Sequence, residues 1–279
     1  MSSRATLRAS LERPRLEIIP MRGIEDQIPY LPRGGVVTVT ASPTKGPEAT
    51  FGLVATLVDL GHRAVPHLAA RSITGRDHLE AVLCRLAALR IREAFVIAGD
   101  TRQPAGPYEG AADLLEAMAE LGHGLEEIGI TGYPEPHALI DDRTIIEAMA
   151  RKAPHATYIV SQICYEAPAI RRWIHDVRAR GIRLPIHIGL PGVVDRARLL
   201  RLSLRVGLGD SVRYLSKQSE VAGRLLAGYE PGDLVHELAD LLADPAADVA
   251  GWHLFTFNEV RRTEQWRARQ LAATRGVAL

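Results

Sequence analysis

The sequence predicts a single (β/α)8 barrel, a closed ring of eight parallel strands surrounded by helices. Eight short apolar segments alternate with longer segments in which apolar residues recur at helical spacing. The chain has 279 residues, and this fold typically takes roughly 250. An open doubly wound sheet is the main alternative. It would carry a Gly-x-Gly-x-x-Gly turn after its first strand, and the sequence has none there.

The predicted strands are short runs rich in aliphatic and β-branched residues. Residues 95–100 are the most informative, because four apolar residues in a row indicate a strand buried on both faces. Gly99 then lets the backbone turn and leaves Asp100 at the carboxyl end, where parallel barrels carry their chemistry. The predicted strands cover residues 15–19, 36–40, 64–68, 95–100, 127–131, 157–162, 185–189 and 252–257.

The predicted helices follow the strands and place their apolar residues on one face. In residues 76–90, for example, Leu79, Val82 and Leu86 recur at helical spacing. Residues 193–250 are mostly helical and longer than one repeat needs, so we expect extra helices between strands seven and eight. The other predicted helices cover residues 47–60, 109–121, 142–152, 168–180 and 258–271.

The predicted domain organisation is simple. Residues 1–14 are polar and predict an N-terminal tail or a short first helix. Residues 15–279 predict one barrel domain that carries the catalytic site.

The composition excludes several classes of protein. The net charge is +1, so the chain lacks the basic footprint of nucleic-acid binding. Two cysteines give neither a disulfide framework nor a cysteine-rich metal site. No apolar run approaches the roughly 18 residues of a membrane span, and residues 1–15 lack the apolar core of a secretory signal. We therefore expect a cytoplasmic protein with no nucleic-acid or membrane partner.

Polar residues on or just after the predicted strands would gather at one mouth of the barrel. Thr40 is compatible with an ordinary strand residue, His67 with a buried structural group and His137 with a loop residue. Glu17 and Gln162 are harder to explain in that way, because each lies in an apolar run where a polar group needs partners. The full set is Glu17, Thr40, His67, Asp100, His137, Gln162 and Asn258.

A metal-dependent barrel hydrolase is one interpretation of the ten histidines. Such barrels often begin with His-x-His on the first strand, whereas this strand carries Leu16, Glu17 and Ile18. We therefore predict no metal site.

The order of these segments resembles that of the bacterial methylenetetrahydrofolate reductases, which are flavin-dependent (β/α)8 barrels. The most distinctive match is the family's Tyr-Pro-Glu-x-His, found here at residues 133–137. The other matches are residues 16–20 for Phe-Glu-Phe-Phe-Pro, 39–40 for Val-Thr, 66–69 for Pro-His-Leu-Thr, 97–100 for Leu-Arg-Gly-Asp, 160–162 for Ile-Thr-Gln, 191–192 for Pro-Gly and 255–258 for Tyr-Thr-Leu-Asn.

The resemblance implies an oxidoreductase of one-carbon metabolism and methionine biosynthesis. It would interconvert 5,10-methylenetetrahydrofolate and 5-methyltetrahydrofolate, with hydride passing from NAD(P)H through FAD. Glu17 would be the general acid that protonates N10 of the folate, and its apolar neighbours should raise its pKa enough to hold a proton near neutral pH. Asp100 would offset the positive iminium formed when the bridge opens. Gln162 and Phe257 would bind the folate together with Asp100.

The resemblance also implies a set of flavin-binding residues and assembly into homo-oligomers. A basic residue near the end of the predicted helix 142–152 would reach the flavin diphosphate. The cofactor-binding residues implied are Thr40, His67, Gly99, Asp100, Tyr108, His137, Arg151 and Lys152.

Two departures from the family keep alternatives open. The arginine of the family's Arg-Gly-Asp is replaced by Ala98, and aromatic residues make up only 5% of the chain. Both changes remove contacts that a flavin or folate ring would use. The alternatives are a folate- or flavin-binding barrel without turnover, acting as an accessory subunit, and a flavin-independent folate oxidoreductase.

Overall fold

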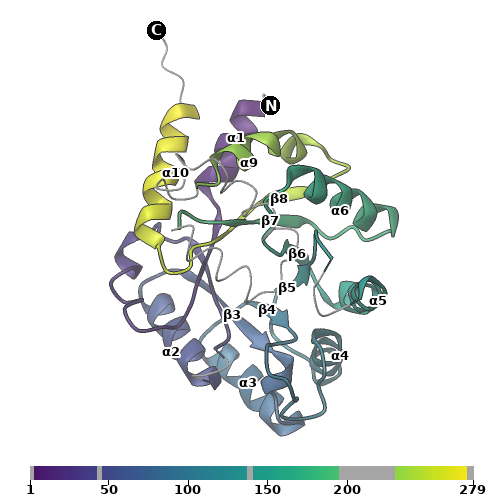
Figure 1. Cartoon of the computed structure of the whole chain (residues 1–279). Coiled ribbons are helices and arrows are strands. Elements are labelled where there is room, and N and C mark those ends of the chain that lie inside the picture. Colours follow the sequence, from purple (N-terminus) through teal and green to yellow (C-terminus); the bar gives the residue numbers. More distant parts are fainter. Residues whose placement is uncertain (1–2, 43–45, 137–140, 195–229, 275–279) are drawn as a thin grey trace.

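The structure is a closed barrel of eight parallel strands with helices around it (Figure 1). This computed structural model describes residues 3–42, 46–136, 141–194 and 230–274. Strands pair in chain order, and β1 closes the ring against β8 with Arg15 beside His253. The predicted (β/α)8 fold is therefore confirmed, and the carboxyl ends of all the strands meet at one mouth.

The strands lie within a few residues of their predicted positions. β4 starts earlier than predicted, at Glu93, and ends at Ile97, so Gly99 and Asp100 lie in the loop after it. Glu93 can begin this buried strand because its carboxylate is paired with Arg15 inside the barrel, which offsets the free-energy cost of burying the charge. The strands are β1 Arg15–Ile18, β2 Val36–Val39, β3 Arg63–Ala69, β4 Glu93–Ile97, β5 Glu127–Gly132, β6 Tyr158–Ser161, β7 Ile186–Pro191 and β8 Val249–Phe255.

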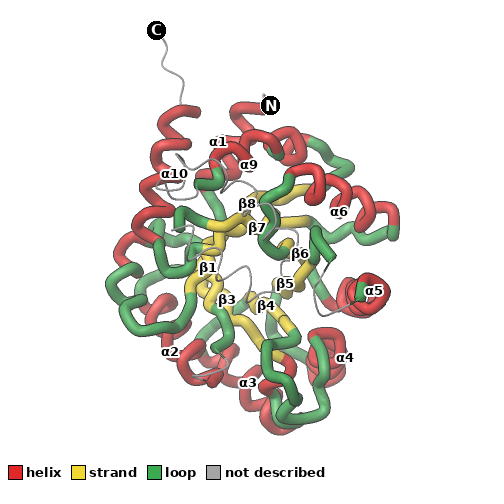
Figure 2. Tube along the Cα trace, in the orientation of Figure 1, coloured by secondary structure: helices red, strands yellow, loops and turns green. Residues whose placement is uncertain are grey.

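Helices form the outer layer of the molecule, as Figure 2 shows. The described part of the stretch between β7 and β8 contains α9, Gly232–Glu237, and a short 3₁₀ helix, Ala239–Ala243. Residues 195–229, where further helices are predicted, lie outside the described residues. The remaining described α-helices are α1 Ser3–Glu12, α2 Gly46–Asp59, α3 Arg76–Ala88, α4 Ala111–Leu121, α5 Asp142–Lys152, α6 Ala167–Ala179 and α10 Val260–Thr274.

The N-terminal segment forms the short helix α1, which was one of the two predicted alternatives. Leu7 and Leu11 lie one turn apart and are both buried in the main core. Ser10 Oγ accepts a hydrogen bond of 2.8 Å from Trp252 Nε1 in β8, and Arg267 donates to the Leu11 carbonyl at 3.0 Å. Two apolar residues in a polar helix therefore suffice to attach it to α10 and the barrel.

The core has two separate parts. The larger lies between the strands and the helices. The smaller fills the barrel itself and consists of Val65, Phe95, Tyr158 and Val160. Since side chains alternate along a strand, polar residues in phase with these four also point into the barrel. No helix among the described residues is long and apolar enough to cross a membrane.

Gly129 tests how tightly this interior is packed. A Cβ at this position would overlap the rings of Tyr158 and Phe95. We expect Gly129→Ala to lower the free energy of unfolding by about 1–3 kcal/mol or more, because the rings have no room to move apart. Gly52→Ala is the control, since its Cβ meets nothing within 4 Å on an exposed face of α2 and should stabilise by about 0.5–1 kcal/mol. Denaturant unfolding of both variants measures the difference, and equal effects would contradict a packed interior.

Candidate active site

Glu17 lies inside the barrel at the middle of β1. Its neighbours Leu16 and Ile18 are fully buried in the outer core, so the alternation of the strand turns Glu17 inward. Its side chain is 12% exposed. Burial raises the pKa of this carboxyl to about 7, against an opposing effect of His67. The raised pKa is as expected, but its cause is burial inside the barrel, because the side chains of Leu16 and Ile18 point to the opposite face of the strand.

Two buried histidines converge on one oxygen of Glu17. His253 Nε2, from β8, is 3.1 Å from Glu17 Oε2, and His67 Nε2, from β3, is 3.4 Å from the same atom. Burial lowers the pKa of His67 to about 4 and that of His253 to about 3, so both rings are neutral at neutral pH. Ring contacts hold the imidazoles in place, with His67 4.9 Å from Phe95 and His253 4.8 Å from Phe255 between centroids.

Sequence reasoning found Glu17 and His67 but missed His253. A usable signal exists, because residue 253 alternates with Phe255 on a predicted strand and therefore faces the same side. Strand eight of a closed barrel lies beside strand one, so an inward histidine on strand eight can reach an inward carboxylate on strand one.

The other predicted site residues lie higher, where the strands end. Asp100 is exposed in the loop after β4, and its charge raises the pKa of Tyr133 as a smaller effect than burial. Thr40 follows β2, where its backbone N–H donates to the Ile18 carbonyl at 3.0 Å. Gln162 follows β6, and its Oε1 accepts a hydrogen bond of 2.9 Å from the backbone N–H of Ile163. These residues surround the mouth above Glu17.

Two residues after β8 have mainly structural surroundings. Phe257 is buried, with a φ of 50°, and Asn258 has a φ of 63°. The Asn258 amide accepts from the Ile19 N–H at 2.8 Å and donates to the Ile19 carbonyl at 2.9 Å. This double hydrogen bond joins the carboxyl ends of β1 and β8, and asparagine tolerates the left-handed conformation that the turn requires.

The residues expected at the flavin diphosphate are engaged by other groups of the protein. Arg151, half exposed, pairs with Asp113 at 2.9 Å and Glu116 at 2.8 Å on the neighbouring helix α4. Lys152 is buried and donates from Nζ to the Thr131 carbonyl at 2.9 Å. Burial lowers the Lys152 pKa to about 8.

The remaining flavin candidates give a mixed result. Tyr108 is buried in the main core rather than lining an open site. Gly99 has a φ of 92°, and a Cβ there would lie 3.0 Å from the Cβ of Ala69. His137 lies outside the described residues. Ala98 stands in place of the family's arginine, and the two basic residues expected at the flavin diphosphate are both engaged by other groups.

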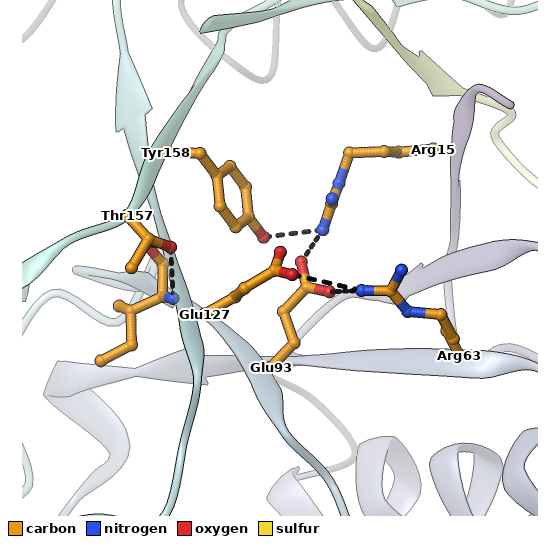
Figure 3. Close-up of polar contacts among 7 residues, drawn as sticks. Arg15, Arg63, Glu93, Glu127, Thr157 and Tyr158 are labelled. Atoms are coloured by element: carbon orange, nitrogen blue, oxygen red, sulfur yellow. Dashed lines mark hydrogen bonds and ion pairs between the residues drawn. The ribbon is translucent and has the colours of Figure 1, made fainter. Parts of the chain in front are cut away.

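The floor of the barrel is a charged network formed by the first residues of five strands: Arg15, Arg63, Glu93, Glu127 and Tyr158 (Figure 3). Arg15 donates to Glu93 and, at 2.8 Å, to the Tyr158 hydroxyl. Arg63 pairs with Glu93 at 3.3 Å and Glu127 at 3.4 Å. The arrangement closes the end of the barrel opposite the mouth with paired charges.

The floor also acts on the layer above it. After burial, the positive charge of Arg15 is the next largest cause that lowers the pKa values of His187 and His253. Because Arg15 and Glu17 are two residues apart on β1, the network lies directly beneath the carboxyl with its two imidazoles.

Comparison with known proteins identifies the family. A family model described as methylenetetrahydrofolate reductase matches residues 28–205. The chain belongs to the methylenetetrahydrofolate reductase family. The match takes in β2 to β7, including Thr40, His67, Asp100 and Gln162, whereas Glu17 and His253 lie outside it.

Two curated methylenetetrahydrofolate reductases show the distance of this relationship. Methylenetetrahydrofolate reductase 1 of Schizosaccharomyces pombe is 27% identical over 152 residues, which are 51% of this chain and 25% of that protein. Methylenetetrahydrofolate reductase 2 of Saccharomyces cerevisiae is 27% identical over 100 residues, which are 34% of this chain and 17% of that protein. The chain thus matches a quarter or less of each relative's own length.

The floor yields a stability prediction. Glu93→Gln removes the anion that neutralises Arg15 in a buried setting, so we expect the free energy of unfolding to fall by about 3–5 kcal/mol. Glu126→Gln breaks the exposed pair with Arg92 and should cost at most about 1 kcal/mol. Urea unfolding of both variants is the measurement. A Glu93→Gln protein as stable as Glu126→Gln would show that the buried pair is not needed.

Proposed function

We propose that this chain interconverts 5,10-methylenetetrahydrofolate and 5-methyltetrahydrofolate, with NAD(P)H as the electron partner, in one-carbon metabolism and methionine biosynthesis. The observation that carries the proposal is a buried carboxyl with a pKa of about 7, placed at the centre of the barrel of a methylenetetrahydrofolate reductase family member. The proposal is made for this chain by itself, because its match covers a quarter or less of each of the two curated relatives.

Glu17 is the proposed general acid. Opening the one-carbon bridge breaks its bond to N10, and the N10 nitrogen must take a proton as the electron pair returns to it. A carboxyl with a pKa of about 7 is protonated in a large fraction of molecules at neutral pH, so Glu17 can supply that proton. The 5-iminium cation that remains then accepts hydride to give the methyl group.

Asp100 and Gln162 are proposed to hold the folate at the mouth. Asp100 is an exposed carboxylate, so it can lie near the iminium and offset its positive charge. The backbone N–H of Ile163 donates to Oε1 of Gln162 and so orients the amide. The NH2 group of the same amide is then proposed to bind the pterin. Phe257, beside Asn258, is the proposed apolar contact for the folate.

The hydride source is proposed to be the reduced nicotinamide. The two cations expected at a flavin diphosphate, Arg151 and Lys152, are engaged by other groups of the protein. This supports the flavin-independent alternative over the flavin-dependent one. A binding barrel without turnover would not account for an acid held at the centre of the barrel with two imidazoles.

The cellular setting is proposed to be the cytoplasm. Both cysteines are free thiols, Cys84 at the surface and Cys164 in the core, which suits a reducing compartment. Burial raises the pKa of the Cys164 thiol, so it stays uncharged at neutral pH. Assembly into homo-oligomers stays a prediction from the family resemblance.

Removing the acidic group of Glu17 should slow turnover strongly. We expect Glu17→Gln to lower kcat for 5,10-methylenetetrahydrofolate reduction by about 10²- to 10⁴-fold, because the glutamine side chain occupies the same space as the carboxyl but cannot act as an acid. Glu12→Gln, at the exposed end of α1, is the control. In the native protein the reductive rate should fall as pH rises through about 7, where the carboxyl loses its proton. An unchanged rate in Glu17→Gln would rule out this acid.

The flavin question has a direct test. We expect the purified protein to lack a flavin absorption band, to bind no added FAD, and to oxidise NADH or NADPH in the presence of 5,10-methylenetetrahydrofolate. Omitting the folate is the control for nonspecific oxidation. A yellow protein bleached by NAD(P)H and recoloured by the folate would refute flavin independence while supporting the reductase. Folate binding without NAD(P)H oxidation would favour the accessory barrel.

A further inference from the structure

His253 is the inner residue whose surroundings the proposed chemistry does not yet explain. It is 1% exposed, and its Nε2 lies 3.1 Å from Glu17 Oε2. Its other ring nitrogen, Nδ1, is buried with no hydrogen-bond partner among the described residues. Glu17 is therefore the polar partner around which this ring is oriented.

The missing partner at Nδ1 decides which nitrogen carries the proton. A neutral imidazole has one N–H donor and one bare nitrogen. A buried N–H without an acceptor is costly, so the hydrogen belongs on Nε2, where Oε2 can accept it. His253 therefore donates to Glu17, and Oε2 is the accepting oxygen whether or not the carboxyl is protonated.

His67 lies near the same oxygen but does not form a hydrogen bond with it. Its Nε2 is 3.4 Å from Oε2 and has no hydrogen-bond partner among the described residues. His253 is therefore the donor that occupies Oε2, and the hydrogen of the neutral carboxyl is left to Oε1.

We propose that His253 is a positioning residue for Glu17: its Nε2–H holds Oε2 as an acceptor, so that Oε1 carries the proton delivered to the substrate. The proposal rests on the assignment of Glu17 as general acid and adds what orients it. Once Oε1 has given up its proton, the same hydrogen bond stabilises the carboxylate that remains. His253 itself gains and loses no proton in the step.

The charged and titratable groups that act on Glu17 and His253 come from three strands of the barrel. They are His67 from β3, His187 from β7 and Arg15 from β1. Burial and Arg15 both act to keep His253 neutral, so that it adds no positive charge that would favour the carboxylate over the acid. His187 is a matched control, because it is also an inner imidazole, yet its ring contacts Tyr158 at 5.5 Å rather than Glu17.

Three variants separate positioning from packing. His253→Leu fills the space without a donor, and His253→Gln places an amide N–H near the position of Nε2. We expect His253→Leu to lower kcat about tenfold, to leave KM for the folate nearly unchanged, and to move the alkaline limb of the pH profile up by about one pH unit. His253→Gln should restore the native limb, and His187→Leu should leave both kcat and the limb as they are.

An infrared titration of the carboxyl provides a readout that needs no turnover. The C=O stretch of protonated Glu17 is assigned by subtracting the spectrum of Glu17→Gln. In His253→Leu the band should move to higher frequency, because Oε2 loses a donor, and its pH midpoint should rise with the kinetic limb.

The outcomes are distinct. A band and midpoint in His253→Leu equal to those in His187→Leu would overturn the positioning role, as would a His253→Gln protein that behaves like His253→Leu. If the native protein turns over no folate, the proposed function fails, and the infrared titration still decides whether His253 orients Glu17.

Discussion

The buried ion pair between Arg15 and Glu93 is the constraint on which the interior of this barrel depends. Both side chains are under 10% exposed, and they join β1 to β4 across the barrel rather than along the sheet. Neither charge could be kept there alone, because an unpaired buried charge is destabilising by several kcal/mol. The pair fixes the position of Arg15, and through it the electrostatic environment of His187 and His253 in the layer above.

The interior is thus arranged in layers of different polarity along the barrel axis. The floor holds full charges that neutralise one another. The middle layer holds imidazoles that burial keeps neutral, those of His67, His187 and His253, and a carboxyl whose pKa burial raises to about 7. The mouth holds Asp100, exposed to solvent. The charges of the floor are tolerated because they are paired, and that of Asp100 because it is hydrated. The carboxyl of Glu17, the proposed acid, has neither a cationic partner nor full hydration.

The parts predicted from the sequence are those that local pattern determines. The strands follow from apolar runs, and the inward direction of Glu17 follows from alternation with Leu16 and Ile18. The contact between Glu17 and His253 joins residues 236 positions apart and exists only because the barrel closes. The direction of Arg151 depends on how α5 packs against α4, where Asp113 and Glu116 compete with any ligand for its charge. Helix α1 has two buried leucines, too few for a pattern, so docking decides its structure.

The closed floor has a consequence for the order of events in each catalytic cycle. Glu17 has the Arg15–Glu93 pair and aromatic rings beneath it, and the folate is proposed to bind above it at the mouth. We therefore expect a carboxylate that has given its proton to N10 to take one back from water after the product has left. In that case Glu17 exchanges one proton with solvent in each catalytic cycle, through the same mouth that binds the substrate, and no proton crosses the barrel from one end to the other.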